Sequence, residues 1–295
     1  MIEEYWNLQF DPFQNQLSQH WYYESPMHDE TLARLYYVIE KRQRCGVFLG
    51  EEGTGKSLLM QLLKRQSSRT QRQVALIDVY GMEGREILWN LIGGLGLGSH
   101  SHSDTAVLWR ILTDHLTGCS ISFQQLVFLF DHLVHATEQG QKCVERIMHL
   151  AMSQGGWVTS IFSCRSDELG IIPPGIYEQA DLKIKLDPLD AFHTAEYINT
   201  ALQQAGADRT IFPTSTMHHL FEMSKGIPRR INQICHLALL AGVNARAEQI
   251  SPELLNAAQE LAVPPIESIE SSLGTQSPAA KSVTKSGAKN KKKTI

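Results

Sequence analysis

Two stretches of this sequence carry the side chains with the clearest chemistry, and the first is Gly50–Ser57. Its sequence, GEEGTGKS, matches the spacing G-x-x-x-x-G-K-[ST] at every fixed position. The apolar run Val47–Leu49 precedes it, and leucines on one face of a helix follow it. A glycine loop between a strand and a helix directs backbone N–H groups at phosphate oxygens. We therefore predict a phosphate-binding loop formed by Gly50, Glu51, Glu52, Gly53, Thr54, Gly55, Lys56, Ser57 and Leu58.

The residue types in this loop match the parts of a nucleoside triphosphate. Gly53 and Gly55 allow the backbone to turn inward. We expect Lys56 to reach the β- and γ-phosphates of ATP and the Ser57 hydroxyl to bind Mg²⁺. The alternative is a glycine turn before a core helix, but a strand and a helix on the correct sides of the loop favour nucleotide binding.

The second stretch is Leu126–Asp131, a run of apolar residues that ends in an acid. A carboxylate at the end of a buried strand beside the loop orients Mg²⁺ in many nucleotide sites, and we predict this role for Asp131. The next residue is His132, where many ATPases of this architecture have a glutamate that polarises the attacking water. Histidine can act as a base but lacks the negative charge of glutamate. His132 is therefore a catalytic candidate, beside the alternative that it only fills space.

These residues need a scaffold of buried strands and covering helices. Strands are predicted over residues 47–49, 73–80, 126–131, 157–163 and 182–186. Helices are predicted between them over residues 29–39, 58–63, 85–95, 107–116 and 144–152. Beyond Pro188 the pattern is helical only, over residues 191–205, 214–224, 229–246 and 252–262. This alternation predicts an α/β fold, in which a parallel sheet has helices on both faces and a small all-α lid domain follows.

Changes in composition set the predicted domain boundaries. They give an N-terminal lead-in segment (1–27), a nucleotide-binding core (28–187), a helical lid (188–263) and a disordered Lys-rich tail (264–295). The tail has six lysines and no acid after Pro278, which leaves 21 basic against 31 acidic residues in the rest of the chain. An acidic body disfavours a broad nucleic-acid surface on the folded part. For the tail we favour a solvated, disordered end over nucleic-acid binding.

The overall composition excludes several classes of protein. The 295 residues are 42% hydrophobic and 20% charged, as in ordinary globular proteins. The N-terminus has no signal-peptide pattern, and no apolar stretch approaches the ~18 residues of a membrane helix. The cysteines are scattered, which is typical of a reducing compartment. We expect a cytoplasmic protein without a transmembrane segment.

Several segments resemble the AAA+ ATPases related to general secretion pathway protein A, a family with relatives in pilus biogenesis and among transposition helper ATPases. The resemblance covers roughly residues 5–261. Its segments are YWNLQFDPF, SPMHDETLARLYYVI, GEEGTGKS, SCRSDELG, LDPLDAFHTAEYINTALQQAG and SKGIPRRINQICHLALL. The resemblance implies a P-loop AAA+ core that uses ATP and Mg²⁺. It also implies that Arg229, in the G-I-P-R motif, is the lid sensor (sensor 2) that touches the γ-phosphate.

The sequence departs from this family at the positions whose side chains accelerate ATP hydrolysis. His132 replaces the usual glutamate, and Ala180 stands where the family has an arginine that acts across a subunit interface. The sensor at the end of the fourth strand is Ser163 or Arg165, and neither matches the usual residue. Loss of an arginine supplied in trans can slow hydrolysis by about 10³-fold or more.

These observations leave several functions open. One is an ATPase that couples its nucleotide state to assembly of a secretion or pilus machinery, as a homo-oligomer with an unidentified protein partner. The alternative is a switch with poor hydrolysis, which binds ATP or ADP and recruits a partner. A DNA-associated transposition-type helper is a further, less favoured alternative. Peripheral attachment at the inner membrane stays open beside a free cytoplasmic location.

Overall fold

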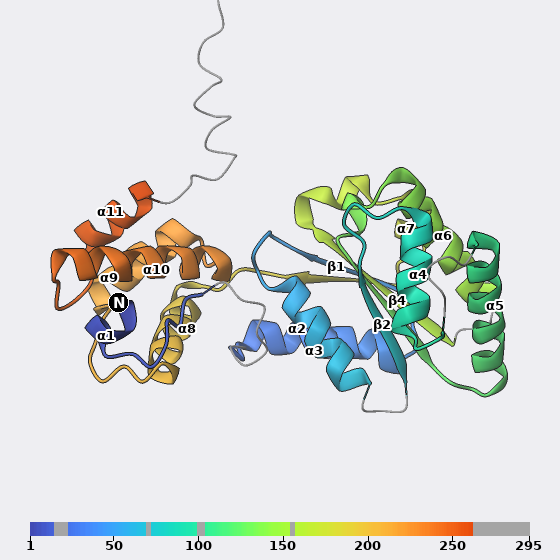
Figure 1. Cartoon of the computed structure of the whole chain (residues 1–295), viewed down its shortest axis with the longest axis horizontal. Coiled ribbons are helices and arrows are strands. Elements are labelled where there is room, and N and C mark those ends of the chain that lie inside the picture. Colours follow the sequence, from blue (N-terminus) through green and yellow to red (C-terminus); the bar gives the residue numbers. More distant parts are fainter. Residues whose placement is uncertain (15–22, 69–71, 99–103, 154–156, 262–295) are drawn as a thin grey trace, which may run out of the picture.

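The computed structural model describes residues 1–14, 23–68, 72–98, 104–153 and 157–261. It contains two units, a sheet covered by helices and a helical bundle, which lie at opposite ends of Figure 1. Residues 264–295, for which we predict a disordered tail, lie outside the described part.

A five-stranded parallel sheet forms the centre of the first unit. Its strands are β1 (Cys45–Gly50), β2 (Gln73–Asp78), β3 (Leu126–Asp131), β4 (Val158–Arg165) and β5 (Leu182–Leu186). They follow the order β2-β3-β4-β1-β5, with β1 between β4 and β5. β1 and β3 are buried along their whole length, because helices cover both faces of the sheet, and this explains their apolar sequences. The predicted α/β fold is confirmed.

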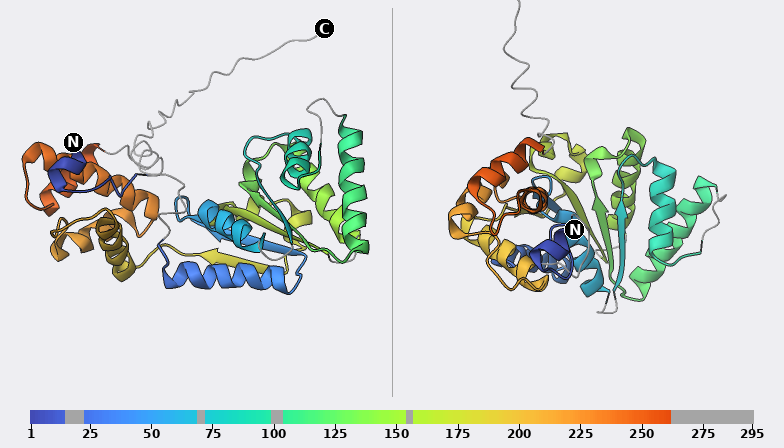
Figure 2. Two further views of the ribbon diagram at one scale, coloured as in Figure 1. Left: turned by 60° about the horizontal axis from the view of Figure 1, so that its bottom comes forward. Right: turned by 60° about the vertical axis from the view of Figure 1, so that its left-hand side comes forward.

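Helices cover the two faces of the sheet, as Figure 2 shows. On one face, α2 (Pro26–Glu40) and α3 (Lys56–Ser67) share an apolar cluster with the strands. The other face is covered by α4 (Gly84–Gly94), α5 (Thr105–Ile121), α6 (Glu138–Ser153) and the short α7 (Pro174–Tyr177). Two 3₁₀ turns, η2 (Leu133–His135) and η3 (Ser166–Ile171), follow β3 and β4 and lead the chain away from the carboxyl ends of these strands.

The second unit is all-helical and has its own apolar core. Its helices are α8 (Ala191–Gln204), α9 (Thr214–Ser224), α10 (Pro228–Ala245) and α11 (Pro252–Leu261), together with the N-terminal α1 (Ile2–Trp6). Trp6 is fully buried in this core and donates a hydrogen bond from Nε1 to the Leu239 carbonyl oxygen, 3.0 Å away. The start of the chain therefore packs against helices more than 200 residues away in sequence.

Several elements extend further than the sequence predicts, and three of them show what sets their ends. Helix α6 begins at Glu138 rather than Val144, because the Thr137 hydroxyl accepts a hydrogen bond from the Gly140 backbone N–H at 3.0 Å. Helix α5 continues past Leu116 to Ile121, with Cys119 buried in the core. Strand β4 runs to Arg165 rather than Ser163, because Arg165 still pairs with the last residue of β1.

Candidate functional site

The predicted phosphate-binding loop connects β1, which lies between β4 and the edge strand β5, to α3. Gly53 and Gly55 have φ angles of 84° and 104°, in the left-handed region that glycine adopts without strain. Gly55 is the N-cap of α3, so the free N–H groups and the positive dipole end of this helix face the loop. Ser57 and Leu58 continue its first turn. The backbone geometry fits a bound phosphate group.

Lys56 lies inside this loop and is 9% exposed. Its Nζ donates hydrogen bonds to the backbone oxygens of Gly50 and Glu51, both at 2.9 Å. Burial lowers the pKa of Lys56, and the negative charge of Asp131 acts against this shift. The ammonium group is thus held by carbonyl oxygens of the loop itself, at the place where an anion seated in the loop would meet it.

Asp131 is buried at the end of β3, next to β4. Its Oδ1 accepts a hydrogen bond from the Ser163 hydroxyl and another from the His132 backbone N–H at 3.1 Å. The predicted metal-side acid and one of the two predicted sensor residues are therefore in direct contact. A fixed carboxylate and the hydroxyl of Ser57 are hard oxygen donors of the kind that Mg²⁺ takes.

His132 has a left-handed backbone conformation, with φ of 58°, and its side chain reaches the end of the neighbouring strand. Its Nδ1 lies 2.9 Å from Oδ1 of Asp78, the last residue of β2. Its ring is 38% exposed and has an edge-to-face contact with Tyr80. His132 is therefore paired with a carboxylate from another strand.

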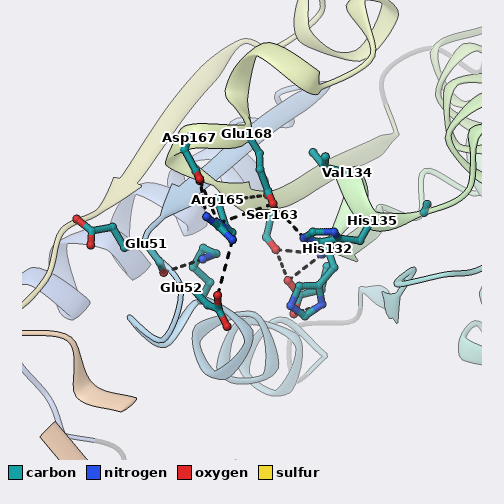
Figure 3. Close-up of polar contacts among 12 residues, drawn as sticks. Glu51, Glu52, His132, Val134, His135, Ser163, Arg165, Asp167 and Glu168 are labelled. Atoms are coloured by element: carbon teal, nitrogen blue, oxygen red, sulfur yellow. Dashed lines mark hydrogen bonds and ion pairs between the residues drawn. The ribbon is translucent and has the colours of Figure 1, made fainter. Parts of the chain in front are cut away.

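Arg165, the other predicted sensor residue, lies beside the loop because its backbone pairs with Gly50. Its Nε donates a hydrogen bond to Asp167 at 3.0 Å, which raises the pKa of Arg165 and lowers the pKa of Asp167. A guanidinium nitrogen also lies 3.7 Å from Oε2 of Glu52, as drawn in Figure 3. The second acid of the turn, Glu168, caps it by accepting the Arg165 backbone N–H and pairs with His135 at 3.0 Å.

Arg229 comes to the same loop from the helical unit. It is the second residue of α10, and its backbone N–H donates to the Gly53 carbonyl oxygen at 3.2 Å. Its guanidinium donates to Oε1 of Glu52 at 3.0 Å. The first turn of α10 therefore touches the loop through both backbone and side chain.

His28 is a neighbour of the loop that the sequence analysis did not single out. It lies in the first turn of α2, and its Nε2 is 3.4 Å from the Thr54 carbonyl oxygen. Its Nδ1 lies 2.6 Å from the hydroxyl of Ser25, the N-cap of the helix. Burial lowers the pKa of His28. The only signal in the sequence was the Ser-Pro start of a helix directly before the loop strand.

The structure thus brings most of the predicted residues together. Lys56, Asp131, Ser163, Arg165 and Arg229 surround or adjoin the loop. Ala180 lies apart from them, in the turn before β5, where it packs against the apolar core. Among the described residues, no helix is long and apolar enough to cross a membrane.

Comparison with known proteins agrees with this fold. Residues 39–162 match a family of AAA domains. General secretion pathway protein A of Aeromonas hydrophila is 24% identical over 245 residues, which cover 82% of this chain and 45% of that protein. The chain therefore spans less than half the length of this curated relative.

Solved structures share the fold at low sequence identity. Cdc6p from Pyrobaculum aerophilum has a TM-score of 0.67 at 12% identity, over 88% of this chain and 73% of that one. The Aeropyrum pernix ORC1 protein, solved in complex with DNA, has a TM-score of 0.63 at 14% identity, over 85% and 68%. The Thermotoga maritima RuvB branch migration motor has a TM-score of 0.52 at 10% identity, over 90% and 86%. These likenesses establish the fold alone.

Proposed function

We propose that this chain is an ATPase of the AAA+ P-loop type, in which the nucleotide at Gly50–Ser57 controls how the helical unit sits on the loop. The observation that carries the proposal is the contact between α10 and the loop. Arg229 bonds to Gly53 through its backbone and to Glu52 through its side chain. Arg229 thus lies where a γ-phosphate on a nucleotide in the loop would meet it.

Each part of the site has a separate task in this proposal. The backbone N–H groups of the loop hold the phosphates, and Lys56 turns from the Gly50 and Glu51 carbonyl oxygens to the β- and γ-phosphates. Mg²⁺ would neutralise the phosphate charge. The Ser57 hydroxyl would bind it, and Asp131 would orient it. Arg229 follows the γ-phosphate, and α10 moves with it.

A hydrolysis-poor switch is the second candidate, and His132 is the observation that favours it. The Nδ1 atom of this residue is paired with the Asp78 carboxylate. In addition, the sequence has alanine at position 180, where the resemblance implies an arginine that accelerates hydrolysis. A switch of this kind would bind ATP, close the helical unit onto the loop and recruit a partner. Slow hydrolysis would then return it to the ADP state.

The cellular setting is proposed from the relative alone. Its name links it to general secretion, and we propose that this chain acts, as an oligomer, on a protein partner in an assembly of the secretion or pilus type. The DNA-associated alternative depended on lysines 281–293, which lie outside the described residues, and we do not pursue it.

Phosphate release over several hours, with Mg²⁺ and ATP, separates the two candidates. The ATPase predicts release by the wild-type chain that Lys56→Ala reduces to background. The switch predicts background release by both chains and measurable release by His132→Glu, because a carboxylate then stands beside Asp131. Turnover that is insensitive to Lys56→Ala would contradict both candidates.

A further inference from the structure

Glu52 is an acidic residue in the middle of a phosphate-binding loop, and its carboxylate faces two arginines. Oε1 lies 3.0 Å from a guanidinium nitrogen of Arg229, and Oε2 lies 3.7 Å from one of Arg165. Figure 3 shows the Glu52 carboxylate below Arg165, while the side chain of the neighbouring Glu51 points away from this pair. The two oxygens of one carboxylate thus face cations from two separate elements.

Backbone contacts hold both arginines at this place. Arg165 pairs with Gly50 in the sheet and is further held by Asp167. The Arg229 backbone bonds to Gly53, where an added Cβ would lie only 2.8 Å from the Arg229 Cβ. The arginines would therefore stay beside the loop without Glu52. The carboxylate binds to them there but does not determine their position.

Arginine binds carboxylate and phosphate oxygens with the same planar set of donors. A γ-phosphate on a nucleotide in this loop approaches the charges that Glu52 now neutralises. We propose that Glu52 is a specificity-determining residue whose carboxylate competes with the γ-phosphate for Arg229 and Arg165, and so reduces the preference for ATP over ADP. This inference rests on the proposed binding of ATP at Gly50–Ser57.

The competition affects the two nucleotides differently. ADP has no γ-phosphate, so the Glu52–Arg229 pair can stay in place when ADP binds. ATP must displace the carboxylate, which then lies near phosphate oxygens of the same sign. Because the side chains of Glu52 and Arg229 are 66% and 60% exposed, water screens the pair and the effect is modest.

The test measures dissociation constants of ADP and of a non-hydrolysable ATP analogue with Mg²⁺, in the wild type and in Glu52→Gln. Glutamine keeps the size of the side chain and removes its charge. The preference for the ATP analogue over ADP should rise roughly threefold, as expected for an exposed ion pair. In the Arg229→Ala background, Glu52→Gln should change this preference less, because the main partner of the carboxylate is gone.

Glu51→Gln is the matched control, since it removes the same charge one residue earlier from a side chain that points elsewhere. It should alter the affinities for both nucleotides in equal proportion. An unchanged or reduced preference in Glu52→Gln, or an equal rise in Glu51→Gln, overturns the role of Glu52. If Lys56→Ala does not weaken binding of either nucleotide, the proposed function itself fails. A changed preference for the ATP analogue over ADP in Glu52→Gln would then not support it.

Discussion

Single side chains stabilise the conformation of the phosphate-binding loop through hydrogen bonds to its backbone, and His28 is the clearest example. Its ring is buried between the Ser25 hydroxyl and the Thr54 carbonyl oxygen, so it joins the start of α2 to the loop. The Thr54 hydroxyl bonds to the Glu51 carbonyl oxygen at 2.8 Å and closes the loop from inside. In a neutral imidazole protonated at Nε2, Nδ1 accepts a hydrogen bond from the Ser25 hydroxyl and Nε2 donates one to the Thr54 carbonyl oxygen.

We predict that acid weakens the fold through His28. An unfolded histidine titrates near pH 6.5, and burial lowers the pKa of His28 below this value. As the pH falls below about 6.5, the unfolded chain takes up a proton that the folded chain does not, so the free energy of unfolding decreases by up to about 1.4 kcal/mol per pH unit. Urea unfolding at pH 5 and pH 7 measures this loss.

His28→Gln is the informative variant, because an amide can still donate to Thr54 but does not titrate. The difference in unfolding free energy between the two pH values should be smaller in His28→Gln than in the wild type. An equal pH dependence in both chains would show that His28 is not the group responsible.

The sequence predicts the loop residues from their spacing, and Asp131 from the apolar run that it ends. It could not show that Glu52 faces Arg165 and Arg229. Glu52 and Arg229 lie more than 170 positions apart in the sequence, and all three residues meet only in the folded chain. It also left the sensor open between Ser163 and Arg165. The structure gives them different neighbours, Asp131 for Ser163 and Glu52 for Arg165.

The junction between the loop and α10 is where two elements meet with no spare room. Gly53 has a φ of 84°, and a Cβ at this position would lie 2.8 Å from Arg229 and 3.1 Å from Ile227. Pro228 starts α10 with its ring at the first helical position, where no backbone N–H is needed. A side chain at residue 53 would therefore push α10 away from the loop.

We predict that Gly53→Ala weakens nucleotide binding at least about tenfold and lowers the free energy of unfolding by about 1–3 kcal/mol, the cost of a strained backbone. Gly81→Ala is a matched control, because Gly81 also has positive φ, 69°, but an added Cβ meets nothing within 4 Å. Both variants should lose stability, and only Gly53→Ala should lose nucleotide affinity. Equal nucleotide affinity in the two variants would show that the α10 contact is not needed.

Most elements could be predicted from the sequence, because apolar runs and helical stripes mark buried surfaces. The strands Leu126–Asp131 and Leu182–Leu186 and the helix Thr214–Ser224 have the predicted ends. The short helix α1 could not be found, because its five residues show no full helical period and it is buried by a partner far away in sequence. Element ends were wrong where a cap or a strand partner, rather than the apolar pattern, sets them.

The molecule as a whole has separate apolar cores for its sheet and its helical unit. Trp6 belongs to the helical core, where an added Cβ at Gly242 would lie 2.5 Å from its ring. The start of the chain is thus a structural part of the unit that carries Arg229. Movement of α10 over the loop would take the N-terminal segment with it.

We predict that Trp6→Ala destabilises the helical unit by about 3–5 kcal/mol, because it leaves a large cavity and removes the hydrogen bond from the indole to the Leu239 carbonyl oxygen. Calorimetry should show a separate, earlier transition for this unit. Trp89→Ala is the control, since Trp89 is 41% exposed on the sheet unit and should change the unfolding midpoint little. A single unshifted transition in Trp6→Ala would contradict the structural role of the N-terminal segment.

The most direct test of this account is equilibrium binding of a fluorescent ATP analogue to the whole chain with Mg²⁺, compared with Lys56→Ala. The account predicts saturable binding that unlabelled ATP displaces, and a loss of affinity of at least about tenfold in Lys56→Ala, because the buried ammonium is the main cation of the loop. Equal binding by the two chains, or no binding by the wild type, would contradict the assignment of Gly50–Ser57 as a nucleotide site.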